Sequence, residues 1–347
     1  MPSASRSVQL GPLQAQAGPA TLTLYGRPDY TRHVAAIYHI NFVQAIAIGL
    51  LQGITELFPV SSLGHTVLVP SWIGGTWATL VHQESQAESP YLAFVVGLHL
   101  ATAFVLLAFY IREWVRLVVG FFGSIAKRRV TTDEERLAWL IVVATVPVGI
   151  LGLVLEHQFR VLFAKPLSAA IFLIVNGCVL MAGERHRRRH EPTRQPEPAH
   201  HARRWRDRRI VPMDESAERR LSRIGIVSAA VIGVSQASAL LAGISREGVA
   251  MVGGLFRGLD NENAMRFSFL LSTPVIFAAG ILKVPDLLGT LGNGIRSEVV
   301  AGSVAAVLSS LFAVVFLSRY FQTRTLVPFA VYCWAFGVAS VIRFGVF

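Results

Sequence analysis

The stretch GLLQGITELFPVSSLG, residues 49–64, aligns without gaps on GVSQASALLAGISREG, residues 233–248, and this match decides the fold. The identical positions are Gly49 with Gly233, Gln52 with Gln236, Leu57 with Leu241, Ser61 with Ser245 and Gly64 with Gly248. Internal sequence similarity of this kind is typical of membrane proteins that are built from structural repeats. The chain is therefore predicted to consist of two related halves.

Both copies of the repeat interrupt an apolar helix. In each, a short apolar segment runs into a turn of Gly, Pro or Ser residues and then continues in apolar sequence. Irregular backbone at membrane depth is tolerated only where it is buried in protein or lines a wet cavity. We therefore predict two re-entrant helical hairpins, each returning to the side of the membrane from which it came.

The sequence around the two hairpins is that of an integral membrane protein. Of 347 residues, 53% are hydrophobic and only 15% are charged, whereas soluble domains average about 25% charged residues. Apolar runs near the membrane-spanning length of about 20 residues occur at 91–111, 137–155, 168–183, 267–282, 299–317 and 326–342. The predicted fold class is an all-α polytopic membrane protein with six spanning helices plus two re-entrant helical hairpins in an inverted repeat.

The inversion follows from the distribution of basic residues. The segments 112–136 and 184–223 are rich in Arg and Lys, which places them in the cytoplasm by the positive-inside rule. The segment 74–90 has no Lys or Arg and lies outside. The first hairpin precedes this outer segment and the second follows a cytoplasmic one, so they enter the membrane from opposite sides. Inverted repeats place their binding site near the midplane, where the repeats meet.

The predicted organisation has four parts: an N-terminal tail at 1–33, a first membrane repeat at 34–183, a basic cytoplasmic linker at 184–222, and a second membrane repeat at 223–347. No cleavable signal peptide is evident in the tail. The net charge of +11 does not indicate a nucleic-acid partner, because the basic residues cluster between apolar spans instead of forming a basic face. The partner expected from composition is the membrane bilayer.

The first hairpin carries an unusual set of polar side chains. Glu56 is surrounded by apolar residues, and an intramembrane carboxylate indicates a functional site; the alternative is a polar residue at a helix end that reaches the interface. Ser61, Ser62 and His65 follow, and Gly64 lies among them. A turn of this composition presents hydroxyls and free backbone N–H groups to an anion.

The second hairpin adds a cation. Arg246 follows Ser245 and precedes Gly248 in a glycine-rich turn. A guanidinium at this depth needs an anionic partner, and its planar fork suits phosphate oxygens; the alternative is a structural ion pair with Glu247 or Glu56. A carboxylate, hydroxyls, an imidazole and a cation together suit phosphoryl transfer, where catalysis is mostly positioning and charge stabilisation.

The two motifs resemble a known family. LLQGITELFPVSSLGHTVLV at 50–69 looks like the first signature of the undecaprenyl-diphosphatase (bacitracin-resistance) family, and LLAGISREGVAMVGGLFRGLDNENAMRFSFLLSTPVIFAAG at 240–280 is similar to its second signature and the following span. The resemblance covers most of the chain from about residue 41. It implies hydrolysis of a C55 polyprenyl diphosphate to the monophosphate on the extracytoplasmic face of the cell membrane, which recycles the lipid carrier for cell-wall glycans.

The resemblance also implies residue roles. Glu56 matches the essential glutamate, Ser62 the active-site serine, His65 the family's histidine, and Ser245 with Arg246 the phosphate-binding pair. From the chemistry of these side chains we expect Glu56 to act as a metal ligand or general base and His65 to carry a proton. Ser61, Gly64, Gly248 and Gln52 are expected to contact substrate. The nucleophile is either Ser62 or an activated water.

Some positions depart from the family pattern. Gln52 stands where a second glutamate is common, Leu63 replaces a threonine, and Ala242, Glu247 and Ala250 replace proline, serine and threonine. The loss of a carboxylate weakens any site for Mg²⁺ or Ca²⁺, which favour charged oxygen ligands. Since inverted repeats also serve alternating access, the alternative function is a polyprenyl-phosphate transporter or lipid-binding protein without hydrolysis.

Overall fold

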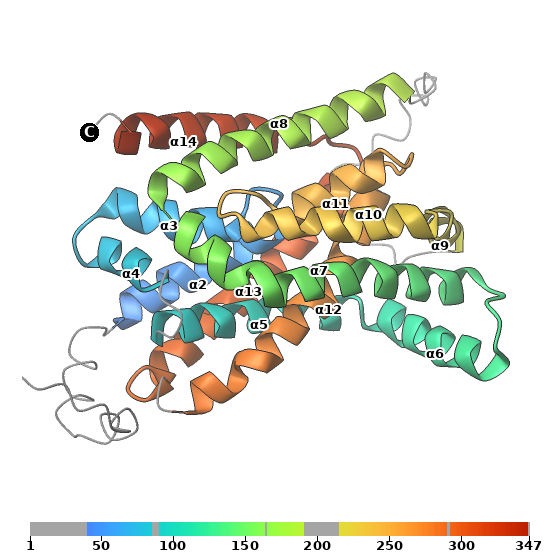
Figure 1. Cartoon of the computed structure of the whole chain (residues 1–347), viewed down its shortest axis with the longest axis horizontal. Coiled ribbons are helices and arrows are strands. Elements are labelled where there is room, and N and C mark those ends of the chain that lie inside the picture. The colour runs from blue at the N-terminus through green and yellow to red at the C-terminus, as the bar shows by residue number, and fades with distance from the viewer. Residues whose placement is uncertain (1–39, 85–89, 164, 191–214, 290–291, 346–347) are drawn as a thin grey trace, which may run out of the picture. The chain divides into compact units, whose positions relative to one another are not determined.

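The computed structural model describes residues 40–84, 90–163, 165–190, 215–289 and 292–345 (Figure 1). The predicted tail at 1–33 lies outside the described residues, as does the part of the predicted linker at 191–214. Within the described ranges all regular structure is helical, without a strand.

Among the described residues, six helices are long and apolar enough to cross a bilayer. They are α5 (Pro90–Phe109), α7 (Asp133–Phe163), α8 (Pro166–His190), α12 (Asn261–Leu288), α13 (Arg296–Tyr320) and α14 (Val327–Gly345). Each of the six predicted spans corresponds to one of these helices. The prediction of an all-α, multi-pass membrane protein is confirmed.

The two repeated stretches form broken helices, as predicted. The first consists of α2 (Phe42–Leu57) and α3 (Ser62–Ile73), and the second of α10 (Ile226–Gln236), a 3₁₀ turn η4 (Ala237–Leu240) and α11 (Arg246–Leu255). The longest of these helices, α2, has 16 residues, which at 1.5 Å per residue is shorter than the hydrocarbon core of about 30 Å. These lengths are compatible with re-entrant hairpins.

Packing between the helices is reciprocal, as a two-fold repeat requires. Helix α2 packs on α13 and its counterpart α10 packs on α7, while α5 packs on α12 and α8 on α14; Figure 1 shows α8 and α14 running alongside each other. A Cβ atom added to Gly177 of α8 would lie 2.9 Å from the Ala330 oxygen of α14, and one added to Gly337 of α14 would lie 3.1 Å from the Ala170 oxygen of α8. Each of the two helices thus contributes a glycine that lets the backbone of the other approach closely.

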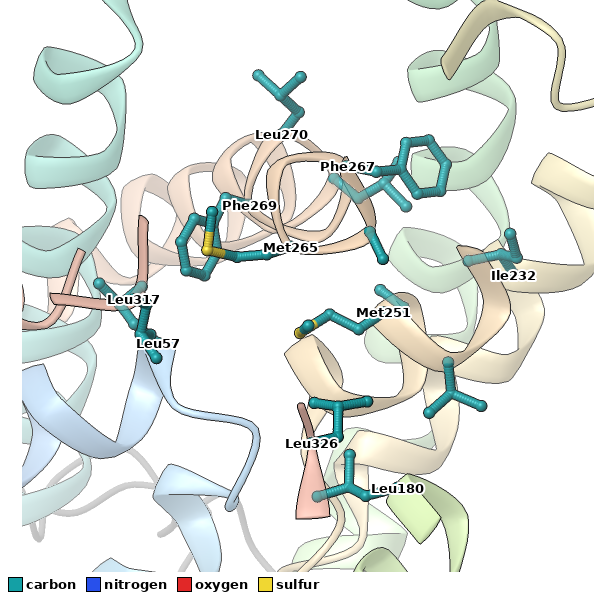
Figure 2. Close-up of a cluster of buried hydrophobic side chains, with 14 of the residues drawn as sticks. Leu57, Leu180, Ile232, Met251, Met265, Phe267, Phe269, Leu270, Leu317 and Leu326 are labelled. Atoms are coloured by element: carbon teal, nitrogen blue, oxygen red, sulfur yellow. The ribbon is translucent and has the colours of Figure 1, made fainter. Parts of the chain in front are cut away.

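A shared apolar cluster joins the halves beside the hairpins. Figure 2 labels side chains of this cluster, which come from several helices: Leu57, Leu180, Ile232, Met251, Met265, Phe267, Phe269, Leu270, Leu317 and Leu326. Lipid tails are as apolar as leucine, so it is close packing of these side chains that favours association of the helices inside a membrane. The turns between the broken helices are supported by both halves.

Two segments expected to be loops continue as helix. The predicted basic loop at 112–136 contains α6 (Ile111–Lys127) and the start of α7, because α6 is amphipathic and packs on α7, where the Trp139 indole donates to the Ser124 hydroxyl at 2.9 Å. The predicted linker starting at 184 begins inside α8, since Glu184 bonds the Arg187 and Arg188 side chains at 2.8 Å and so stabilises another helical turn. The remaining helices are α4 (Thr76–Glu84) and α9 (Glu215–Ser222).

Candidate active site

The first turn, between α2 and α3, is held by Ser61. This residue has a positive φ of 72°, a conformation that is uncommon for a residue with a side chain. Its hydroxyl caps α3 by accepting from the Gly64 amide at 3.2 Å, and it also accepts from the Gly243 amide of the other hairpin at 3.1 Å. One hydroxyl therefore shapes the first turn and fixes it to the second.

The second turn, between η4 and α11, repeats this capping arrangement. The Ser245 hydroxyl accepts from the Gly248 amide at 3.0 Å, which satisfies one of the free N–H groups at the start of α11. Gly243 adopts a positive φ of 112°, and a Cβ atom on Gly64 would lie 2.9 Å from the Gly243 Cα. The two backbones touch at these glycines, so the turns of the two repeats meet inside the protein.

A second cross-link between the turns comes from α8. The fully buried Asn176 donates from Nδ2 to the Pro59 carbonyl at 2.9 Å and accepts at Oδ1 from the Ser245 amide at 3.0 Å. The amide group thus satisfies one buried backbone group in each turn. Asn176 was not among the predicted site residues, although a lone asparagine in the apolar span 168–183 was a signal for it.

Glu56 is the centre of the polar cluster formed by the turns. Its Oε1 accepts from the Arg246 guanidinium at 3.0 Å. Its Oε2 accepts from the Ser62 hydroxyl, and from the Gln52 amide at 2.9 Å. The structure therefore brings Glu56, Ser62, Gln52 and Arg246 together, as the sequence predicted.

A further histidine completes the cluster. His99 of α5 places Nε2 3.3 Å from Glu56 Oε2, and its Nδ1 lies 2.9 Å from the Val95 carbonyl oxygen. The His99 side chain is 16% exposed and that of Arg246 19%, whereas Glu56 is 1% exposed. His99 was missed in the sequence, where its only signal was an isolated ionisable residue inside an apolar span.

His65 faces a different set of groups. Its Nδ1 lies 2.6 Å from the Ser61 carbonyl and its Nε2 lies 2.7 Å from the Tyr332 hydroxyl. The ring also stacks on Tyr332, with centroids 5.7 Å apart. Both ring nitrogens of His65 face these partners, so the side chain links α3 to α14. The histidine that contacts Glu56 is His99 and not His65.

Glu247 follows Arg246 at the start of α11. Its side chain is buried, and its Oε1 finds no hydrogen-bond partner among the described residues. The Glu247 backbone oxygen accepts from the Ser268 hydroxyl at 3.2 Å, which fixes the start of α11 to α12. Arg246 pairs with Glu56 across the hairpins, so of the two structural pairs considered for it in the sequence, the longer-range one forms.

The predicted metal ligand, Glu56, is surrounded by hydrogen-bond donors. Two of these donors, Arg246 and His99, are basic side chains, whereas Mg²⁺ and Ca²⁺ are held by oxygen ligands that include carboxylates. Among the described residues no group of three or more His, Cys, Asp or Glu side chains is arranged to hold a metal ion. The cluster as it stands does not fit a divalent cation.

Comparison with known proteins shows the family to which this chain belongs. Residues 45–339 match the family model described as "Bacitracin resistance protein BacA". This chain belongs to that family. The match includes both turns, Asn176 and His99.

Curated relatives in the family are similar over nearly their whole length. The chain is 52% identical over 304 residues to the "Undecaprenyl-diphosphatase" of Mycolicibacterium paratuberculosis. This alignment covers 88% of this chain and 97% of the relative. The chain is 49% identical over 346 residues to the "Undecaprenyl-diphosphatase 2" of Frankia alni, with 89% and 100% covered. A more distant relative, the "Undecaprenyl-diphosphatase" of Granulibacter bethesdensis, is 40% identical over 310 residues, with 88% and 97% covered.

Proposed function

We propose that the protein hydrolyses undecaprenyl diphosphate to undecaprenyl phosphate and inorganic phosphate in the cell membrane. The observation that carries the proposal is the contact of Glu56 with Ser62 on one hairpin and Arg246 on the other. The names of the relatives support hydrolysis and give no support to the alternative of a non-hydrolytic transporter. A place in cell-wall synthesis and a link to bacitracin resistance follow from the family.

The proposed reaction uses Glu56 as the general base. The attacking oxygen, of Ser62 or of a water, forms a bond to the terminal phosphorus and passes its proton to the Glu56 carboxylate. The bond from that phosphorus to the bridging oxygen breaks, and the electron pair leaves with the lipid monophosphate. If Ser62 attacks, a water then hydrolyses the phosphoserine and releases phosphate.

Arg246 is proposed to bind the phosphate oxygens, because its guanidinium offers several donors in one plane. Ser61, Gly64, Ser245 and Gly248 are the proposed substrate-binding positions at the two capped turns. Because the Gly64 and Gly248 amides already donate to the capping serines, the donors proposed for the substrate are the other N–H groups in the first turns of α3 and α11. A pre-arranged set of donors of this kind stabilises the charge that develops on a transferring phosphoryl group. We further propose that the site opens to the extracytoplasmic face, as the resemblance to the family implies.

The test is phosphate release from undecaprenyl diphosphate by the purified protein in detergent. The wild type is expected to release phosphate. Glu56→Gln is expected to lose about 10³-fold or more in kcat/KM, because an amide cannot accept the proton from the nucleophile. His186→Gln, near the C-terminal end of α8, serves as a control for substitution as such. Full activity in Glu56→Gln would eliminate the glutamate-centred mechanism, and a wild type without phosphate release would favour the transporter.

A further inference from the structure

Two basic side chains flank the Glu56 carboxylate, one from each half of the protein. Arg246 bonds Oε1 and His99 lies against Oε2. We propose that His99 binds the phosphate groups of the substrate together with Arg246, as the second arm of a cationic clamp. This inference rests on the proposed function and adds a substrate contact to it.

The contacts of the His99 ring assign it a positive charge. Its Nδ1 faces the Val95 carbonyl, which is an acceptor only. Its Nε2 faces Glu56, which receives bonds from Arg246, Ser62 and Gln52 and is therefore the acceptor of this pair as well. A ring that donates from both nitrogens is an imidazolium.

His65 differs from His99 in this respect. Its Nδ1 also faces a carbonyl, that of Ser61, but its Nε2 faces the Tyr332 hydroxyl, which can donate to it. A neutral ring satisfies both contacts. His99 is therefore the histidine whose surroundings require a cation.

The two cations are also the members of the cluster that a ligand can reach. The side chains of His99 and Arg246 are 16% and 19% exposed, whereas Glu56 is 1% exposed. Glu56 is the carboxylate that both cations contact, and it is buried between them, so an anion such as a diphosphate approaches the cluster from the side of the two cations. Arg246 and His99 are accordingly the groups that an incoming phosphate meets first.

The length of the His99 contact shows how the clamp and the base work together. At 3.3 Å, the contact from Nε2 to Glu56 Oε2 is longer than the most common N–H···O length of about 2.9–3.0 Å, so it is a long member of its kind. A phosphate oxygen can therefore take over the Nε2–H donor at little cost. Glu56 Oε2 then loses one donor and is better able to accept the Ser62 proton, so substrate binding would activate the base.

The experiment compares His99→Ala and His99→Gln with the wild type and with the control His186→Gln. Phosphate release from undecaprenyl diphosphate gives kcat and KM, and competition by inorganic pyrophosphate gives an inhibition constant. We expect His99→Ala to lower kcat/KM about 100-fold and to weaken pyrophosphate inhibition about 10-fold or more. His99→Gln keeps a neutral donor and is expected to fall between His99→Ala and the wild type, while His186→Gln behaves as the wild type.

Two results would overturn the clamp. One is a folded His99→Ala protein with the wild-type kcat/KM. The other is a His99→Ala protein that loses turnover but retains the wild-type inhibition constant for pyrophosphate, because His99 would then act only through Glu56. Folding is checked by thermal unfolding in detergent, and His99→Gln supplies the same comparison if His99→Ala does not fold.

Failure of the proposed function is distinguishable from failure of the clamp. If the wild type releases no phosphate, the proposed hydrolysis is wrong. The thermal shift caused by pyrophosphate then tests the clamp without turnover: a smaller shift in His99→Gln than in the wild type supports it, and equal shifts reject it.

Discussion

The two hairpin turns share a scaffold but differ in chemistry. In each, a serine caps the second helix by accepting from a glycine amide three residues later: Ser61 from Gly64, and Ser245 from Gly248. The residue after this serine is Ser62 in the first turn and Arg246 in the second. The position of Glu56 is occupied by Leu240 in the second copy.

This difference explains why the site needs both halves. The first turn supplies a carboxylate and hydroxyls, and the second supplies the guanidinium that compensates the buried carboxylate charge. A buried charge without a partner is costly. A buried carboxylate at the first turn therefore requires a compensating cation, which the second turn supplies. The two copies share the same backbone arrangement at the serine cap and differ in the side chains that follow it.

The predicted opposite orientation of the two turns in the membrane is the feature whose test has the largest expected effect. A cysteine replacing the exposed Thr79 on α4 should react with a membrane-impermeant thiol reagent in intact cells. A cysteine replacing the exposed Arg223, after α9, should react only after lysis. Cys178 and Cys333 are first replaced by Ala, since Cys178 is exposed. Labelling of both sites in intact cells would show that the repeats are not inverted.

The pairing of the two turns through charge is tested at Arg246. Arg246→Ala removes the cation proposed to bind phosphate and leaves Glu56 with less compensation, so kcat/KM should fall about 10³-fold or more. Arg246→Lys should recover only part of this loss, because an ammonium cannot reproduce the planar fork. Phosphate release measures both variants. Wild-type turnover in Arg246→Ala would remove this residue from the site.

The pairing of the turns through the backbone is tested at Asn176. Asn176→Leu leaves the Pro59 carbonyl and the Ser245 amide without their buried partner, which should cost about 2–4 kcal/mol of stability and lower kcat about 10-fold. Thermal unfolding and phosphate release measure the two effects. The exposed asparagine Asn293 gives the control Asn293→Leu. A variant as stable and active as this control would show that Asn176 does not hold the turns together.

The smallest effect compares the matched glutamines. Gln52 bonds Glu56 at 2.9 Å, whereas the equally buried Gln236 has no hydrogen-bond partner for either side-chain atom in the described part of the chain. Gln52→Leu should lower kcat about 10-fold. Gln236→Leu should keep activity and raise stability by about 1 kcal/mol, since burial of an unpaired amide is unfavourable. Equal losses of activity in the two variants would mean that the second turn also has a chemical role at this position.

Most of the fold was predictable because a membrane limits the possible structures. Backbone groups in lipid must be satisfied within a helix, so each apolar run of sufficient length predicts a span, and all six spans are present. Helix α6 was not predicted, because its basic residues resemble a loop and its packing on α7 is a tertiary contact.

The sequence by itself also determined the repeat, the two interrupted helices and the set of Glu56, Ser62 and Arg246, since these depend on local pattern and on the cost of polar groups in an apolar segment. Only the tertiary structure decided which partners meet. It placed His99 of α5 against Glu56, Asn176 of α8 between the turns, and His65 against Tyr332. A single polar residue in an apolar helix carries no information about its partner, because the partner depends on how distant helices pack.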